Sequence, residues 1–213
     1  MMSTPNVLHV DEHLLVIEKP AGLACVPGRG ALASGSMSQR VQALFPDALI
    51  VHRLDMATSG LVLMARGPAA HRLLSMAFQE RAVAKFYQAI VLGSIEAESG
   101  VIDLPLAADW PRRPMQRADP LSGKPSLTRF RVLQRDAVTR RTRVELEPVT
   151  GRSHQLRVHM QALGHPILGD ALYGPAATAG APIAERLMLH ASRLNFTHPI
   201  SGGALAFQSA PPF

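Results

Sequence analysis

Two neighbouring segments in which polar and apolar residues alternate place the strongest constraint on the fold. They are SLTRFRVLQRD, residues 126–136, and TRRTRVELEPV, residues 139–149. Successive side chains of a β-strand point to opposite faces of a sheet, so alternation with a period of two predicts strands. A short polar turn around Asp136 joins them. The two segments therefore predict a ribbon that carries much of its charge on one face.

The rest of the chain mixes short strands with short helices. Strands are predicted within residues 7–19, on either side of Asp11-Glu12-His13, and at 61–66, 84–93 and 187–196, and helices at 36–45, 69–82 and 153–164. In the last helix Ser153 is the expected N-cap, Gly164 is the expected stop, and Arg157 should oppose the apolar stripe. No repeat or linker interrupts the pattern, which favours one α+β (mixed α/β) domain over residues 1–213.

The composition limits the class of protein. Hydrophobic residues make up 47 % of the 213 residues, but no apolar run reaches the roughly 18 residues of a membrane-spanning helix. The N-terminal segment lacks the basic start and apolar stretch of a secretory signal, so a cytoplasmic protein is expected. The single cysteine, Cys25, lies beside Gly and Pro and is expected to be a small apolar residue, buried or half-buried, rather than a reactive thiol.

Positive charge is concentrated in one segment. Residues 109–143 contain ten basic and three acidic residues, a net charge of +7, whereas the rest has twelve basic and thirteen acidic residues, a net charge of −1. Such a segment is typical of a surface that binds a polyanion, although an arginine-rich surface can also serve solubility alone. Within it, Arg112, Arg113 and Arg117 are the residues expected to contact the polyanion.

One carboxylate stands out in the sequence. Asp55 lies in VHRLDMATSGLVLMAR, residues 51–66, directly before a Thr-Ser-Gly turn and an apolar run. It fits three roles: a cap for backbone N–H groups of the turn, a structural ion pair with Arg53 or a distant arginine, or a nucleophile in a pocket that excludes water. The spacing of residues alone leaves all three open.

Five segments, in order along the chain, resemble the RluA family of pseudouridine synthases. They are VDEHLLVIEKPAGLACVPG, HRLDMATSG, AKFYQAIVLG, GRSHQLRVHMQALGHPILGDALYG and RLMLHASRLNFTHP. The resemblance implies one catalytic domain with a largely antiparallel central sheet flanked by helices and loops. The N-terminal S4-type domain of many relatives is expected to be absent. The stretch DLPLAADWPRRPMQR is similar to members that act on both tRNA and 23S rRNA.

The resemblance also implies a reaction and its residues. The N1–C1′ bond of a uridine breaks, and the base rotates and rejoins through C5 without cofactor, ATP or metal. Asp55 is the implied nucleophile, and Arg152 its partner, with a bidentate grip on the carboxylate. Tyr87 would stack on the uracil and help to remove the C5 proton. The implied substrate-binding residues are Arg53, which enters the space left by the flipped base, Lys85 and Leu189.

Three classes of function are considered for this sequence. The leading hypothesis is a monomeric RNA pseudouridine synthase acting on a loop uridine of tRNA, 23S rRNA or both. A non-catalytic RNA-binding module would not need catalytic residues at Asp55, Tyr87 and Arg152. A glycoside hydrolase would need a second cooperating carboxylate. A metal site is not expected, because His154 and His159 are poorly spaced on a helix and no cysteine cluster exists.

Overall fold

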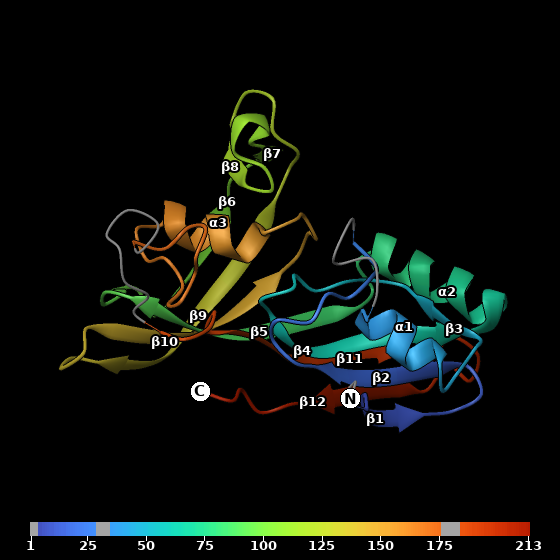
Figure 1. Ribbon diagram of the computed structural model, residues 1–213. Coiled ribbons are helices and arrows are strands. Elements are labelled where there is room, and N and C mark those ends of the chain that lie inside the picture. The colour runs from blue at the N-terminus through green and yellow to red at the C-terminus, as the bar shows by residue number, and fades with distance from the viewer. Residues whose placement is uncertain (1–3, 29–34, 176–183) are drawn as a thin grey trace. The chain divides into compact units, whose positions relative to one another are not determined.

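The structure, a computed structural model, describes residues 4–28, 35–175 and 184–213 (Figure 1). The chain forms two compact units: unit 1 is Met1–Lys85 with Ala191–Pro212, and unit 2 is Phe86–His190 with Phe213. The chain passes between the units within strand β5 (Ala84–Leu92) and again within strand β11 (Leu189–Thr197). Both units combine helices with strands, so the predicted α+β class is confirmed. The expectation of a single domain stays a prediction.

Unit 1 is built on a sheet with the strand order β1-β2-β4-β11. Strand β3 pairs with β4, and β12 pairs with β11. The pairings β1–β2, β2–β4, β3–β4 and β11–β12 are all antiparallel. The strands other than β11 are β1 (Asn6–Val10), β2 (Leu14–Lys19), β3 (Ala48–Ile50), β4 (Ser59–Arg66) and β12 (Ala204–Gln208).

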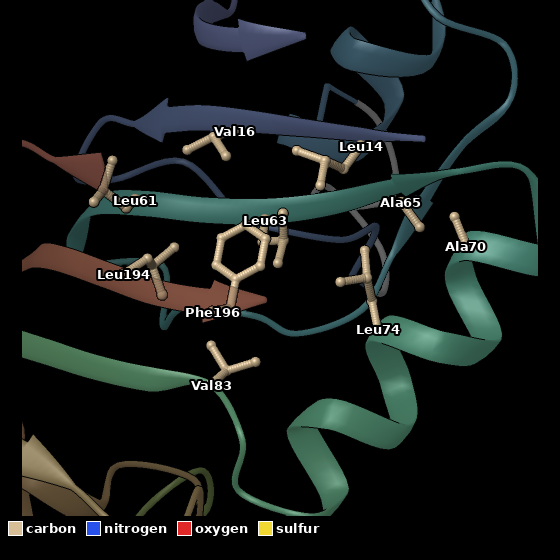
Figure 2. Close-up of a cluster of buried hydrophobic side chains, with 10 residues drawn as sticks. All are labelled: Leu14, Val16, Leu61, Leu63, Ala65, Ala70, Leu74, Val83, Leu194 and Phe196. Atoms are coloured by element: carbon tan, nitrogen blue, oxygen red, sulfur yellow. The ribbon is translucent and has the colours of Figure 1, made fainter. Parts of the chain in front are cut away.

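The central strands β2 and β4 are buried on both faces. Their sequences LLVIEK and SGLVLMAR contain continuous apolar runs, the pattern of strands that are covered on both sides. Helix α2 (Gly67–Gln79) packs on β4, and its buried Ala70 and Leu74 join the core. Figure 2 shows this cluster of buried side chains, which come from β2, β4, β11, α2 and Val83.

A short helix, α1 (Met37–Gln42), packs against β3. Ser36 is its N-cap: the Ser36 hydroxyl accepts the N–H of Gln39, and the Gln39 side chain accepts the N–H of Ser36. This reciprocal capping box explains why the helix begins at Met37. Val41, on its inner face, is fully buried.

Unit 2 is built on an antiparallel sheet with the strand order β5-β10-β9-β6. The predicted ribbon is its centre: β9 (Leu127–Asp136) and β10 (Arg141–Pro148) bury alternate residues, and Phe130 and Val144 point inward. The edge strand β6 (Ser99–Asp103) leads into a small second ribbon of β7 and β8 (Figure 1). This ribbon consists of β7 (Leu106–Ala108), the 3-10 turn η2 (Trp110–Arg112) and β8 (Gln116–Ala118).

Helix α3 (Gln155–Ala162) covers β9 and β10 and differs from the prediction in two ways. Its N-cap is His154, in a left-handed conformation with φ 54°, and not Ser153. Arg157 does not face away from the core. Its guanidinium is buried and forms a bidentate ion pair with the buried Asp170, at 2.7 and 2.8 Å.

Candidate active site

The predicted site residues divide between the two units. Asp55, Arg53 and Lys85 belong to unit 1. The remaining predicted residues belong to unit 2, namely Tyr87, Arg152, Leu189, Arg112, Arg113 and Arg117. Each group is therefore described within its own unit.

The loop that carries Asp55 connects β3 to β4 and is held by a buried lysine. Lys19, the last residue of β2, is fully buried, and its ammonium group donates to the carbonyls of Pro20, Leu23 and Met56 at 2.8, 2.8 and 3.1 Å. A buried cation needs such hydrogen bonds to offset its desolvation. Lys19 thus joins the 20–23 turn to the residue that follows Asp55.

Main-chain hydrogen bonds complete this connection. The N–H of Gly22 donates to the carbonyl of Met56 at 2.8 Å, and the N–H of Thr58 donates to the carbonyl of Asp55 at 3.1 Å. Gly22 has a φ of 81°, in the left-handed region that glycine tolerates best. The turn at Asp55 is therefore closed by backbone atoms, and the half-buried Asp55 side chain is positioned by a fixed main chain.

Two further side chains fix the residues before Asp55. The N–H of Leu54 donates to the sulfur of Cys25 at 3.2 Å, and burial raises the pKa of Cys25, so this thiol stays protonated. Cys25 is buried, as predicted from the sequence. The N–H of Leu63 in β4 donates to Nε2 of His52 at 2.9 Å. His52 therefore braces the loop by accepting a backbone N–H of β4.

The His52 ring belongs to a small aromatic and cationic cluster. It stacks on Phe78 of α2 with ring centroids 4.5 Å apart, and the Lys85 ammonium lies 5.9 Å from the Phe78 centroid. Burial, with a smaller contribution from the Lys85 charge, lowers the pKa of His52 to about 3. Burial also lowers the pKa of Lys85. Arg53 is exposed, and within the described part of the chain it has no recorded carboxylate partner.

Two predicted residues of unit 2 lie on strands. Tyr87 is half-buried in β5, where it is opposite Leu146 of β10. Leu189 is the first residue of β11 and is buried, with 3 % of its surface exposed. The positions of both residues are therefore set by strand pairing and packing, and neither is on a flexible loop.

The loop of Arg152 is organised by one buried glutamine. The Oε1 of Gln155 accepts the N–H of Arg152 at 3.0 Å and the hydroxyl of Thr150 at 2.7 Å. The Nε2 of Gln155 donates to Leu127 and Thr128 of β9, both at 3.0 Å. Gln155 thus braces the loop through four hydrogen bonds. It ties the backbone of Arg152 to the central strands.

The Arg152 side chain is exposed above this network. Its Nε donates to the carbonyl of Pro125 at 3.2 Å, and among the described residues this is the only recorded acceptor of the guanidinium. The guanidinium therefore has N–H groups left for a carboxylate or a phosphate.

A tyrosine that the sequence analysis did not single out links two of these regions. The hydroxyl of Tyr173 accepts the N–H of Gln116 in β8 and is 2.7 Å from Nδ1 of His154, next to the Arg152 loop. Its ring packs with Leu106 and Val158 and lies 5.0 Å from the Arg157 guanidinium carbon. The sequence places Tyr173 near a Gly-Asp turn but shows no sign of these contacts.

The predicted RNA-binding arginines surround the η2 turn. Arg112 pairs with Asp109 at 2.6 Å, Arg117 pairs with Asp119 at 3.0 Å, and Arg113 stacks on a tryptophan ring. Part of the positive charge of the larger ribbon is neutralised by ion pairs. Three of its arginines pair with glutamates outside the basic segment, as Arg129–Glu147, Arg131–Glu145 and Arg135–Glu98. The excess of positive charge is therefore more local than the sequence suggests.

Neither a metal-ligand cluster nor a membrane-spanning helix is present among the described residues. No group of three or more His, Cys, Asp or Glu residues in residues 4–28, 35–175 and 184–213 could hold a metal ion. In the same residues, no helix is long and apolar enough to cross a membrane.

The fold and these loops define the class of protein. A profile of RNA pseudouridylate synthases matches residues 13–162, and the chain belongs to this family. It is 51 % identical over 200 residues to the dual-specificity RNA pseudouridine synthase RluA of Vibrio parahaemolyticus, covering 92 % of this chain and 79 % of the relative. It is 49 % identical over 208 residues to the enzyme of that name from Yersinia pestis, covering 97 % and 99 %.

A solved structure has the same fold. Human RNA pseudouridylate synthase domain containing 1 is 30 % identical, has a TM-score of 0.81, and is matched over 100 % of this chain and 86 % of that chain. The family inferred from five sequence segments is therefore confirmed.

Proposed function

We propose that this protein isomerises a loop uridine to pseudouridine in both tRNA and 23S rRNA, with Asp55 as the nucleophile. Membership of the pseudouridylate synthase family supports the reaction, and the name of the RluA relatives supports dual specificity. The observation that carries the assignment of Asp55 is its loop. Side-chain hydrogen bonds of Lys19, Cys25 and His52 fix this loop, which is the rigid support that a catalytic carboxylate needs.

The remaining residues have the following proposed roles. Arg152 pairs with the Asp55 carboxylate, and its partly unused guanidinium supports this role. Tyr87 stacks on the uracil and helps to remove the C5 proton. Arg53 fills the space that the extruded uridine leaves, while Lys85 and Leu189 help to hold the base. Arg112, Arg113 and Arg117 contact the RNA outside the reacting nucleotide.

The reaction leaves the atomic composition of the nucleotide unchanged. The N1–C1′ bond breaks, a C1′–C5 bond forms, the C5 proton is lost to solvent, and N1 gains a proton. No oxidant, reductant or second substrate is required. We propose that the protein works as a monomer in the cytoplasm, where its RNA substrates are made.

The test uses RNA transcribed with uridine tritiated at C5. We expect the wild type to release tritium into water from tRNA and from a 23S rRNA fragment, and Asp55→Asn to release none while it still binds RNA. Arg152→Gln is expected to bind RNA and to lose most of the activity. Release at the wild-type rate by Asp55→Asn would refute the proposed nucleophile. Free uracil as the product would indicate a glycoside hydrolase, and binding without release by the wild type would indicate a non-catalytic module.

A further inference from the structure

The loop between β7 and β8 presents an exposed aromatic side chain on a basic surface. Trp110, the single tryptophan of the chain, has 67 % of its surface exposed. It is not part of the hydrophobic cluster that seats the ribbon on α3, which contains Leu106, Val158 and Tyr173. The ring of Trp110 therefore has no role in the proposed catalysis or in the packing of this cluster.

An arginine covers one face of this ring. The guanidinium carbon of Arg113 lies 3.5 Å from the centroid of Trp110, which is the distance of a flat stacking contact. An indole with one face covered can stay 67 % exposed only if its other face is open. Among the residues that the structure describes, Arg113 has no recorded carboxylate partner, so its positive charge is not neutralised.

The loop that carries this stacked pair is held in one conformation. Its ends are joined by the N–H of Asp109, which donates to the carbonyl of Met115 at 3.0 Å, and the N–H of Met115 donates to the carbonyl of Arg112 at 2.9 Å. The buried Asp109 carboxylate accepts from Nε of Arg112 at 2.7 Å. Just beyond the loop, the N–H of Gln116 donates to the Tyr173 hydroxyl. A surface that is already ordered loses little entropy when a ligand binds.

We propose that Trp110 is a stacking platform for a nucleobase of the RNA that does not react. The base would lie on the open face of the indole, and the Arg113 guanidinium on the other face would attract the neighbouring phosphates. Aromatic side chains stack on unpaired bases in this way in many RNA-binding proteins. The inference rests on the proposed function, because it takes RNA as the partner. It goes beyond that proposal by assigning a base contact, and not only phosphate contacts, to this loop.

Charge and shape together favour a nucleobase over other ligands. A phosphate contact needs cations but no exposed ring, and an apolar partner needs rings but no unneutralised arginine. A planar base flanked by phosphates uses both parts of the Trp110–Arg113 pair. The splayed loop of a folded RNA supplies such bases.

The single tryptophan makes the test direct. Full-length Asp55→Asn, which keeps the complex from reacting, is titrated with a transcribed tRNA stem-loop and a 23S rRNA fragment while its intrinsic fluorescence is recorded. Stacking predicts saturable quenching of Trp110, with the midpoint found by anisotropy of labelled RNA. Adding Trp110→Ala is expected to weaken binding about tenfold, and Trp110→Phe is expected to restore most of the affinity.

Salt dependence separates stacking from charge. Trp110→Ala removes no phosphate contact, so the slope of log K against log salt concentration should stay unchanged. The matched control Arg117→Ala is expected to reduce that slope by about one. We also expect that in RNAs with single abasic sites, Trp110→Ala causes no further loss of affinity at one position, namely that of the base that stacks on Trp110.

Three results would overturn the inference. They are unchanged RNA affinity in Trp110→Ala, equal quenching by inorganic polyphosphate, and a uniform effect of Trp110→Ala at every abasic position. Tritium release by the wild type is measured separately. A failure of the stacking inference is thus distinguishable from a failure of the proposed reaction.

Discussion

Removing the Asp170 carboxylate should destabilise unit 2 strongly. Asp170 and Arg157 form a bidentate pair whose side chains are 0 % and 6 % exposed. Asp170→Ala leaves the Arg157 guanidinium buried without its counter-ion. The same carboxylate accepts the N–H groups of Leu172 and Tyr173, at 3.0 and 3.1 Å, and the substitution removes these bonds too.

The magnitude follows from these contacts. Removing one partner of a buried ion pair costs about 3–5 kcal/mol, because the remaining charge is unpaired. The N–H groups of Leu172 and Tyr173 lose their acceptor, which adds about 1 kcal/mol each when solvent cannot replace the carboxylate. We therefore expect the free energy of unfolding to fall by about 5–7 kcal/mol. With an m-value of about 3 kcal/mol/M, the urea midpoint would fall by about 1.7–2.3 M.

The assay is urea unfolding of the full chain, followed by circular dichroism. The matched control is the double variant Arg157→Met with Asp170→Leu, which removes both charges and keeps similar volumes. Replacing a buried pair by apolar side chains is often neutral or stabilising, so this variant should recover most of the loss. A loss below about 1 kcal/mol in Asp170→Ala would refute the reasoning. A double variant as unstable as the single one would show that the backbone hydrogen bonds, and not the unpaired charge, are responsible.

Two further predictions concern unit 1. Gly60, with a φ of 112°, leaves no room for a Cβ beside the backbone of Ala191, so Gly60→Ala should cost more than about 2 kcal/mol in urea unfolding, whereas an unchanged midpoint would contradict this close approach. The folded-state pKa of His52 is about 3, below its unfolded value, so its contribution is complete above pH 6.5 and is lost as the pH falls toward 3. Protonation of His52 should lower the free energy of unfolding by at most roughly 1.4 kcal/mol per pH unit. His52→Gln should remove this part of the pH dependence. Equal pH dependence of the wild type and His52→Gln would refute the contribution of His52.

The secondary structure could be predicted where the pattern is local. The alternation in β9 and β10 and the apolar runs of β2 and β4 gave the correct strands, because burial on one or both faces is written directly in the order of residues. The predicted N-cap of α3, Ser153, was wrong. The Gln155 side chain already satisfies the N–H of Arg152, and the left-handed His154 begins the helix. The buried position of Arg157 depends on a partner thirteen residues away, which periodicity does not reveal.

The site could be predicted only in part, for a similar reason. The sequence singled out Asp55, Arg152 and Tyr87 through resemblance to a family. It gave no indication that Lys19 is fully buried, because its bond to Met56 joins residues that are 37 positions apart. The glutamates that neutralise the arginines of β9 are opposite them only once the strands have paired.

The support of the Asp55 turn has a consequence for when the turn can form during folding. Its contacts join Lys19 to Met56, Cys25 to Leu54 and His52 to Leu63, so they connect segments separated by 37, 29 and 11 residues. Contacts between distant segments form only after the intervening chain has been closed into a loop. The turn therefore reaches its final shape only when β2 has paired with β4. A peptide of residues 50–66 contains the whole HRLDMATSG motif but lacks Lys19 and Cys25, and it cannot take up this shape by itself.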